Sequence, residues 1–202
     1  MELFYADLSP YARKVRVVIE EKGLAGKVKQ SAVNPYEIPE ALSSANPLSK
    51  VPTLVLDDGR ALFDSPLICE YLDATFPGVS LLPARGEARW SVLRRQAIAN
   101  GILDAAFNIA CELNRREPGE RSEKWVKHWV AAIKRSVDAL EAEIDAWPDN
   151  VDLANIATGC ALGYLDVRVK DLLDWRKGRP MLAGWYEVFS RRPSMAATKP
   201  KI

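Results

Sequence analysis

The chain has 202 residues, of which 48% are hydrophobic and 27% are charged. This composition is typical of a folded globular protein, and the length suits one large domain or two small ones. Its 28 basic and 27 acidic residues leave a formal net charge of +1. We therefore expect neither nucleic acid nor an anionic membrane surface as a partner.

The sequence shows no charged leader followed by an apolar stretch, and no apolar run long enough to span a bilayer. Cys69, Cys111 and Cys160 are far apart in apolar surroundings, without CxxC or metal-ligand spacing. They are typical of reduced core cysteines, so we expect a cytoplasmic protein without a metal site.

The first predicted elements are a strand, a tight turn and a helix. Residues 3–5 are apolar and aromatic, as in a buried strand. Ser9 then stands at the N-cap of a helix, Pro10 at its first position, and Gly23 at its stop. The hydroxyl of Ser9 is thus predicted at the positive end of a helix, where an anion can bind.

The remainder of the first eighty residues continues this alternation, giving the order β-α-β-α-β-β-α. Turn residues separate the segments. The predicted elements are strands over 27–33, 51–56 and 61–63, a short helix over 40–45, and a helix that begins after Asp64-Ser65-Pro66.

Only helices are predicted after a linker rich in proline and glycine. They cover residues 85–115, 122–147, 153–175 and a segment from Pro180, and the tail from Pro193 is expected to be irregular. The second carries Trp125 and Trp129 on an apolar stripe, and the third is apolar on most sides, as in a helix buried among others. The chain is therefore predicted to join a small α/β domain to an all-α domain.

Three local features of the first domain could carry chemistry: Ser9, the Val51-Pro52 pair at the head of a strand, and Asp64-Ser65 at a helix start. Taken singly, each has an ordinary structural role as a cap or a strand-initiating proline. Together and in this order they indicate a thioredoxin-like fold.

On these motifs the whole chain resembles the cytosolic glutathione transferases, most closely a bacterial serine-type branch. The resemblance rests on SPYARKV from Ser9, NPLSKVP over 46–52 and FDS over 63–65. It continues through ANIA over 154–157 and GYLD over 163–166.

The resemblance implies a thioredoxin-like α/β N-terminal domain over residues 1–77 and a linker over 78–86. It also implies an all-α C-terminal domain over 87–202 that forms a second-substrate pocket. The implied partners are glutathione, as co-substrate, and a small electrophile, and the implied assembly is a homodimer.

The resemblance also assigns roles to individual residues. The peptide before Pro52 is implied to be cis, and the backbone of Val51 to pair with the cysteinyl part of glutathione. Ser65 and Asp64 are implied to hold the γ-glutamyl carboxylate and ammonium groups, as suits a helix N-terminus and a carboxylate.

Ser9 matches the hydroxyl that activates glutathione in this family. A free thiol has a pKa of about 8.5, and lowering it by about two units requires about 2.7 kcal/mol of thiolate stabilisation. One hydroxyl hydrogen bond plus a helix N-terminus is of that size. Ser9 stands where thioredoxins carry cysteine, and Ala12 replaces any resolving cysteine, so disulfide exchange through the protein is not expected.

Other candidates have weaker signals. Lys50 is a candidate for the glycyl carboxylate of glutathione, with a solvated lysine as the alternative. Asn100 falls where many transferases place an acidic residue that contacts glutathione across the dimer, but a polar helix-surface residue is the simpler interpretation. The aromatic candidates for the second-substrate pocket, for which core packing is the alternative, are Tyr11, Phe107 and Tyr164, and His128 is expected at the surface.

The second domain departs from the family pattern at one helix start. Family members have a Ser/Thr-x-x-Asp capping box there, whereas this chain has Asp152 and Asn155. An Asp cap with Asn155 reaching back would be equivalent, so we expect a structural role.

The sequence leaves more than one function open. The first interpretation is a glutathione S-transferase that conjugates a small electrophile through Ser9. The alternatives are a non-catalytic glutathione-binding or interaction protein, because fold does not determine function, and a glutathione-dependent reductase or isomerase.

Overall fold

The computed structural model describes residues 1–200 and divides the chain into two compact units. Unit 1 comprises Met1–Pro83 together with the segment that begins at Arg192, and unit 2 comprises Ala84–Arg191. The sequence-based division assigned residues 87–202 to the helical domain, whereas the segment that begins at Arg192 lies in unit 1. It belongs to unit 1 because its helix packs on the first helix of that unit.

The sheet of unit 1 has four short strands in the order β2-β1-β3-β4. They are β1 (Glu2–Tyr5), β2 (Lys29–Ala32), β3 (Thr53–Val55) and β4 (Ala61–Leu62). The first two strands are parallel, as a helical crossover allows, whereas β3 is antiparallel to both β1 and β4. The result is the mixed sheet of a thioredoxin-like domain, as predicted.

Helices α1 (Pro10–Glu21) and α3 (Ser65–Thr75) of unit 1 pack together. Their apolar faces form the core of the unit with the inner side chain of β1, and no solvent reaches Leu3, Val15, Val18, Ile68 or Leu72. Prolines limit the segment before β3 to the 3-10 turn Pro35–Glu37 and the short helix α2 (Glu40–Ala45), as the sequence indicates.

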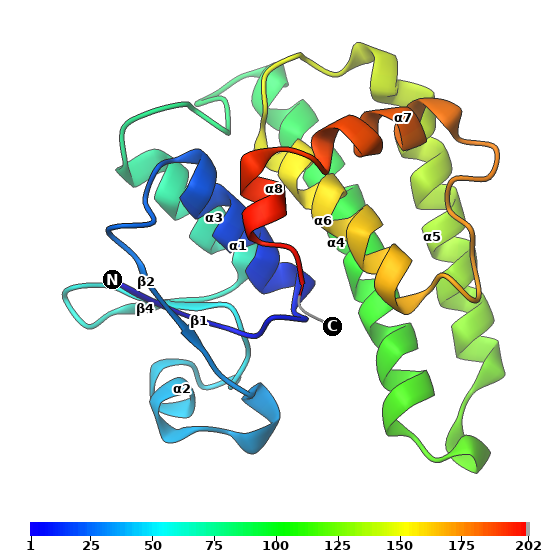
Figure 1. The fold of residues 1–202 in the computed structure, drawn as a ribbon, viewed down its shortest axis with the longest axis horizontal. Helices are drawn as coiled ribbons and strands as arrows, with labels where there is room; N and C mark the ends of the chain where they lie inside the picture. The colour runs from blue at the N-terminus through cyan, green and yellow to red at the C-terminus, as the bar shows by residue number, and fades with distance from the viewer. Residues whose placement is uncertain (201–202) are drawn as a thin grey trace. The chain divides into compact units, whose positions relative to one another are not determined.

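Unit 1 also contains a short helix, α8 (Pro193–Ala197), where the sequence analysis expected an irregular tail. That expectation was wrong because the proline at its first position is compatible with a helix start. In Figure 1, α8 lies beside α1, although the two helices come from opposite ends of the chain.

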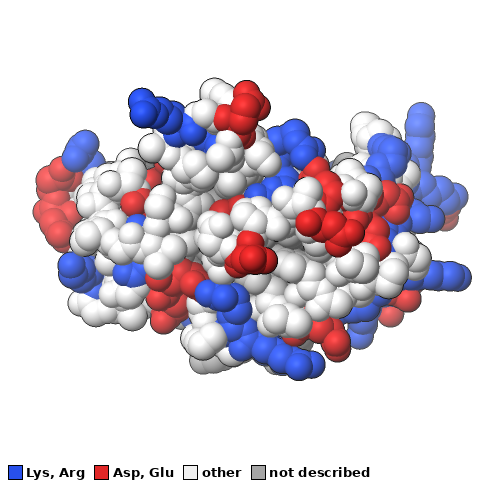
Figure 2. Space-filling model, turned by 90° about the horizontal axis from the view of Figure 1, so that it is seen from above, with Lys and Arg blue, Asp and Glu red and all other residues white. Residues whose placement is uncertain are grey.

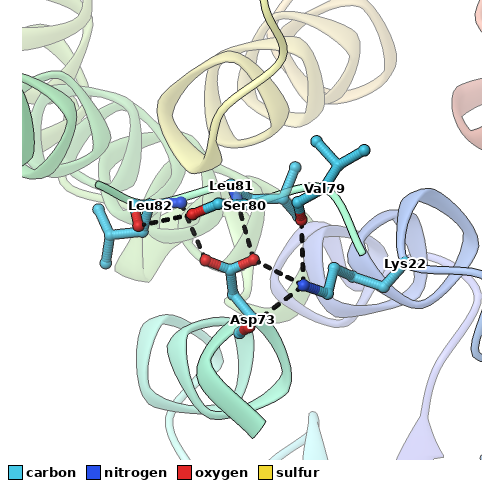
Figure 3. Close-up of polar contacts among 6 residues, drawn as sticks. All are labelled: Lys22, Asp73, Val79, Ser80, Leu81 and Leu82. Carbon is cyan, nitrogen blue, oxygen red and sulfur yellow. Dashed lines mark hydrogen bonds and ion pairs between the residues drawn. The ribbon is translucent and has the colours of Figure 1, made fainter. Parts of the chain in front are cut away.

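A buried ion pair fastens the end of α1 to the segment that follows α3 (Figure 3). Lys22 donates hydrogen bonds to the carboxylate of Asp73 (3.0 Å), to the carbonyl of Asp73 (3.1 Å) and to the carbonyl of Val79 (3.0 Å). The carboxylate also accepts from the backbone amides of Leu81 and Leu82, both at 2.9 Å. Every charged hydrogen-bonding group of this pair is therefore satisfied, as a buried pair requires.

Unit 2 is helical and comprises α4 (Glu87–Arg115), α5 (Glu123–Glu143), α6 (Leu153–Arg168) and α7 (Pro180–Phe189), with 3-10 turns at Pro118–Glu120 and Ile144–Ala146. Helix α4 packs against both α5 and α6. Every residue of α6 from Leu153 to Leu165 is buried, as its all-round apolar sequence predicts. Among the described residues, no helix has both the length and the apolar character that crossing a membrane needs.

Two details of unit 2 differ from the prediction. Helix α6 ends at Arg168 and not near residue 175, because Trp175 folds back and donates its ring N–H to the carboxylate of Asp166 at 2.8 Å. On α5 the apolar stripe is buried only from Ile133 onward, and Trp125 is 53% exposed. Acidic and basic side chains are interspersed on the face shown in Figure 2.

Candidate functional site

The strand pairing of unit 1 brings three predicted site segments to the same end of the sheet. Strand β1 ends beside the start of β3, because Phe4 pairs with Thr53. Strand β4 also ends there, because Leu62 pairs with Leu54. The loop to Ser9, the residues before β3 and the start of α3 all leave the sheet at this end.

Ser9 is the N-cap of α1 and is half-buried. Its Oγ accepts a hydrogen bond from the backbone N–H of Ala12 at 3.2 Å. Because this bond uses only a lone pair, the hydroxyl proton remains available to a further acceptor. The site therefore combines a hydroxyl donor with the partial positive charge of a helix N-terminus.

Val51 and Pro52 are joined by a cis peptide, as the resemblance implies. Val51 is half-buried directly before β3, and its neighbour Lys50 is exposed. The carbonyl of Lys50 accepts hydrogen bonds from the hydroxyl of Thr53 (2.8 Å) and from the side-chain amide of Asn46 (3.1 Å). These contacts hold the backbone just before Val51.

Asn46 is the residue in this region that the sequence analysis missed. Its side chain is fully buried and donates to the hydroxyl of Thr53 at 2.9 Å in addition to the Lys50 carbonyl. Its Oδ1 accepts from the backbone N–H of Leu48 at 2.9 Å. The available signal was the Asn-Pro turn followed by a threonine after Pro52, but no role was predicted for the Asn46 side chain.

The start of α3 supplies the third segment. Asp64 is exposed, and its carboxylate caps the helix by accepting from the backbone N–H of Ser65. Ser65 is fully buried, and its Oγ has no hydrogen-bond partner among the described residues. A buried hydroxyl without a partner at a helix N-terminus fits a carboxylate ligand, because such a ligand would satisfy it.

The aromatic candidates are distributed over both units. Tyr11 is half-buried in α1. Phe107 on α4 is half-buried and Tyr164 on α6 is buried, in two helices that pack together. Asn100 is half-buried on α4. His128 is exposed, as expected, and lies edge-on to the ring of Trp125.

Asp152 and Asn155 form a reciprocal capping box at the start of α6. Asp152 accepts from the backbone N–H of Asn155 at 2.8 Å, and Asn155 accepts from that of Asp152 at 3.0 Å. The carboxylate of Asp152 also binds the guanidinium of Arg95 on α4 at 2.5 Å, and both side chains are almost fully buried. The pair therefore joins α6 to α4 as well as capping α6.

The cysteines form no disulfide: Cys69 and Cys160 are buried, and Cys111 is half-buried. Over residues 1–200, no three His, Cys, Asp or Glu side chains are grouped so that they could hold a metal ion.

Two family models match the chain. Residues 8–75 match the glutathione S-transferase N-terminal domain, and residues 123–187 match the glutathione S-transferase C-terminal domain. The first match contains Ser9, Val51, Pro52, Asp64 and Ser65, which are the residues brought to one end of the sheet.

Individual proteins are similar over the full length. A crystal structure of a glutathione transferase family member from Pseudomonas fluorescens Pf-5, with bound glutathione, is 43% identical, with a TM-score of 0.95 over 100% of this chain and 99% of that chain. Another, with bound S-(propanoic acid)-glutathione, is 42% identical, with a TM-score of 0.91 over 100% of both chains. An uncharacterised GST-like protein of Escherichia coli K12, YibF, is 33% identical over 99% of this chain and 98% of its own length. The chain belongs to the glutathione S-transferase family.

Proposed function

We propose that the protein binds glutathione at the end of the sheet in unit 1 and adds its sulfur to a small electrophile. The observation that carries this proposal is the fully buried hydroxyl of Ser65 at the start of α3, which has no hydrogen-bond partner within residues 1–200 and lies at the same end of the sheet as Ser9 and Val51. A carboxylate at Ser65 and a thiol near Ser9 correspond to the γ-glutamyl end and the central cysteinyl residue of one extended glutathione molecule.

Four residues of unit 1 are the proposed contacts for the glutathione backbone and its charged ends. Ser65 and the amides at the start of α3 hold the γ-glutamyl carboxylate, and Asp64 attracts the ammonium group beside it. Val51 offers its backbone N–H and C=O to the cysteinyl part, and Lys50 is placed to attract the glycyl carboxylate. Asn46 positions this backbone without touching the ligand.

Ser9 supplies the activation. Its hydroxyl donates to the glutathione sulfur and stabilises the thiolate over the thiol, together with the helix N-terminus. The thiol proton is released to solvent, and the sulfur electron pair then forms the new carbon–sulfur bond. The electron pair of the broken bond leaves with the departing group, or moves to a neighbouring carbon that takes a proton from solvent. Ser9 is not itself a nucleophile in this scheme.

The similar structure with bound S-(propanoic acid)-glutathione supports a site of this kind, because that ligand is glutathione carrying a substituent on sulfur. The family resemblance further supports a cytoplasmic location and a homodimer, and mass measurement in solution can test the dimer. The aromatic residues Tyr11, Phe107 and Tyr164 are the proposed contacts for the electrophile.

The test compares wild type with Ser9→Ala. We expect kcat/KM for conjugation of an activated aryl halide to fall about 10- to 100-fold, the size of one hydrogen bond to a charged group. Glutathione affinity, measured by calorimetric titration, should change by less than about threefold, because the γ-glutamyl anchor at Ser65 is intact.

Ser122→Ala is the matched control, because Ser122 is also a helix N-cap, on α5 of unit 2. This variant should be destabilised about as much as Ser9→Ala by loss of a helix cap, but its kcat/KM for conjugation should stay at the wild-type value. Equal rates for wild type and Ser9→Ala would overturn the role of Ser9. Failure of wild type to bind glutathione would overturn the proposed function.

A further inference from the structure

The segment over residues 192–198, here called the C-terminal strap, is tied to the last turn of α1. The guanidinium of Arg192 donates two hydrogen bonds to the carboxylate of Glu21, both at 3.0 Å. The hydroxyl of Ser194 donates to the same carboxylate at 2.5 Å. Burial alone would raise the pKa of Glu21, but the hydrogen bonds from Arg192 and Ser194 outweigh it and hold that pKa below its usual value.

Glu21 lies at an unfavourable position for an acidic residue. An acidic residue in the last turn of a helix faces the negative end of the helix dipole, which is unfavourable. The paired guanidinium offsets that cost. Glu21 is therefore placed to receive the strap and not to stabilise α1 by itself.

A second contact lies in the first turn of α1. Arg13, which is 7% exposed, donates a hydrogen bond from its Nη2 to the backbone carbonyl of Met195 at 3.1 Å. Its own backbone N–H donates to the carbonyl of Ser9 at 3.0 Å. The strap thus reaches the turn that begins at the proposed activating residue.

The strap is itself well ordered by its contacts. Met195 is fully buried, and Thr198 is 2% exposed and donates its hydroxyl to the carbonyl of Ser194 at 2.8 Å. Arg13 and Glu21 are eight positions apart, which corresponds to about 12 Å along a helix. One compact segment therefore holds α1 at two widely separated points.

We propose that the C-terminal strap is a positioning element for Ser9, acting through Glu21 and Arg13 on the orientation of α1. This inference rests on the proposed function. A hydrogen bond to a thiolate weakens steeply with distance and angle, so a small rotation of α1 reduces thiolate stabilisation while the γ-glutamyl anchor on α3 is unaffected.

The experiment measures the pKa of bound glutathione by following the ultraviolet absorbance of the thiolate against pH, with glutathione saturating. Arg192→Gln and Glu21→Gln each break the tie. We expect either variant to raise the thiol pKa by about half to one unit, which lowers the thiolate fraction about three- to tenfold below that pKa. The Kd for glutathione should change by less than about threefold.

The chain offers matched controls one residue away. Arg191→Gln and Glu20→Gln remove the same charges from neighbouring positions that take no part in the tie between Arg192, Ser194 and Glu21. Both should leave the thiol pKa at the wild-type value. The charge-reversed double variant, Glu21→Arg with Arg192→Glu, should restore part of the shift because it rebuilds an ion pair.

Val28→Ala distinguishes a general loss of stability from a specific effect on the thiol pKa. Val28 is buried and lies outside the proposed site. This substitution should lower the melting temperature without moving the thiol pKa. A wild-type thiol pKa in Arg192→Gln, with the variant folded, would overturn the strap proposal alone. A wild type that binds glutathione without lowering its thiol pKa would instead overturn the proposed role of Ser9.

Discussion

Asn46 holds the turn before β3 through three hydrogen bonds made by one buried side chain. Replacing it by alanine leaves the carbonyl of Lys50 and the backbone N–H of Leu48 each without one partner. Losing these buried hydrogen bonds lowers the free energy of unfolding by about 1–3 kcal/mol. Because Val51 follows directly, the same loosening should reduce glutathione binding.

We therefore predict that Asn46→Ala lowers glutathione affinity about tenfold or more in calorimetric titration. Asn34→Ala is the control: Asn34 also orders a turn in unit 1, but it is exposed and precedes the turn Pro35–Glu37. It should leave affinity within about twofold. Equal losses in the two variants would show that Asn46 has no special role at the site.

The start of α6 is held by more than its cap. The cap alone predicts a cost of about 1 kcal/mol for Asp152→Ala. However, Arg95 would then be a buried charge without its carboxylate, and breaking such a pair costs about 3–5 kcal/mol. The ion pair with Arg95 therefore makes the expected destabilisation by Asp152→Ala larger than the capping motif alone predicts.

We predict that Asp152→Ala lowers the free energy of unfolding by about 3 kcal/mol or more, measured by denaturant titration. The double variant Asp152→Ser with Arg95→Met keeps a cap and removes both charges. It should recover most of the loss. A loss near 1 kcal/mol for Asp152→Ala would mean that the cap is the main contribution and the ion pair adds little.

Local patterns predicted the elements well where a short-range signal sets them. Ser9-Pro10 and Ser122 mark helix starts, and α6 is apolar all round and is buried. Other differences arise from contacts that no local pattern reveals. Nothing near Trp175 indicates that its ring returns to Asp166, and no local periodicity pairs Arg192 with Glu21.

In the candidate site, too, residues within short motifs were predictable and contacts formed by folding were not. The resemblance identified the residues at the end of the sheet, because each stands in a short motif. Asn46 was not singled out, because its role depends on burial and on three partners that are visible only in three dimensions. The tie between Arg13 and Met195 joins residues from opposite ends of the chain and has no sequence signal at all.

At the scale of the whole molecule, acid should weaken the fold through its paired carboxylates. The pKa of Glu21 lies below its ordinary value of 4.5. The pKa of Glu2 is also lowered, first by a hydrogen bond from Ser31 and then by Lys29. A carboxyl whose folded pKa is lowered contributes stability above its unfolded pKa and loses it as pH falls through the folded value.

We therefore predict that the free energy of unfolding of wild type falls as pH drops below about 4.5. Glu21→Gln should be less stable than wild type at neutral pH, and this difference should shrink on acidification. Glu20→Gln should follow the wild-type profile. A difference between wild type and Glu21→Gln that is constant from neutral to acidic pH would contradict the assigned pairing.

The discontinuity of unit 1 has a consequence for the order in which the protein matures. Its strands and first helices are synthesised at the beginning, but the residues that hold α1 through Arg13 and Glu21 leave the ribosome only after the whole of unit 2. Domains usually fold as units from the N-terminal side during synthesis. Unit 1 is instead completed only by the C-terminal residues, so a nascent chain interrupted before residue 192 carries every proposed site residue without the contacts that fasten α1 to α8.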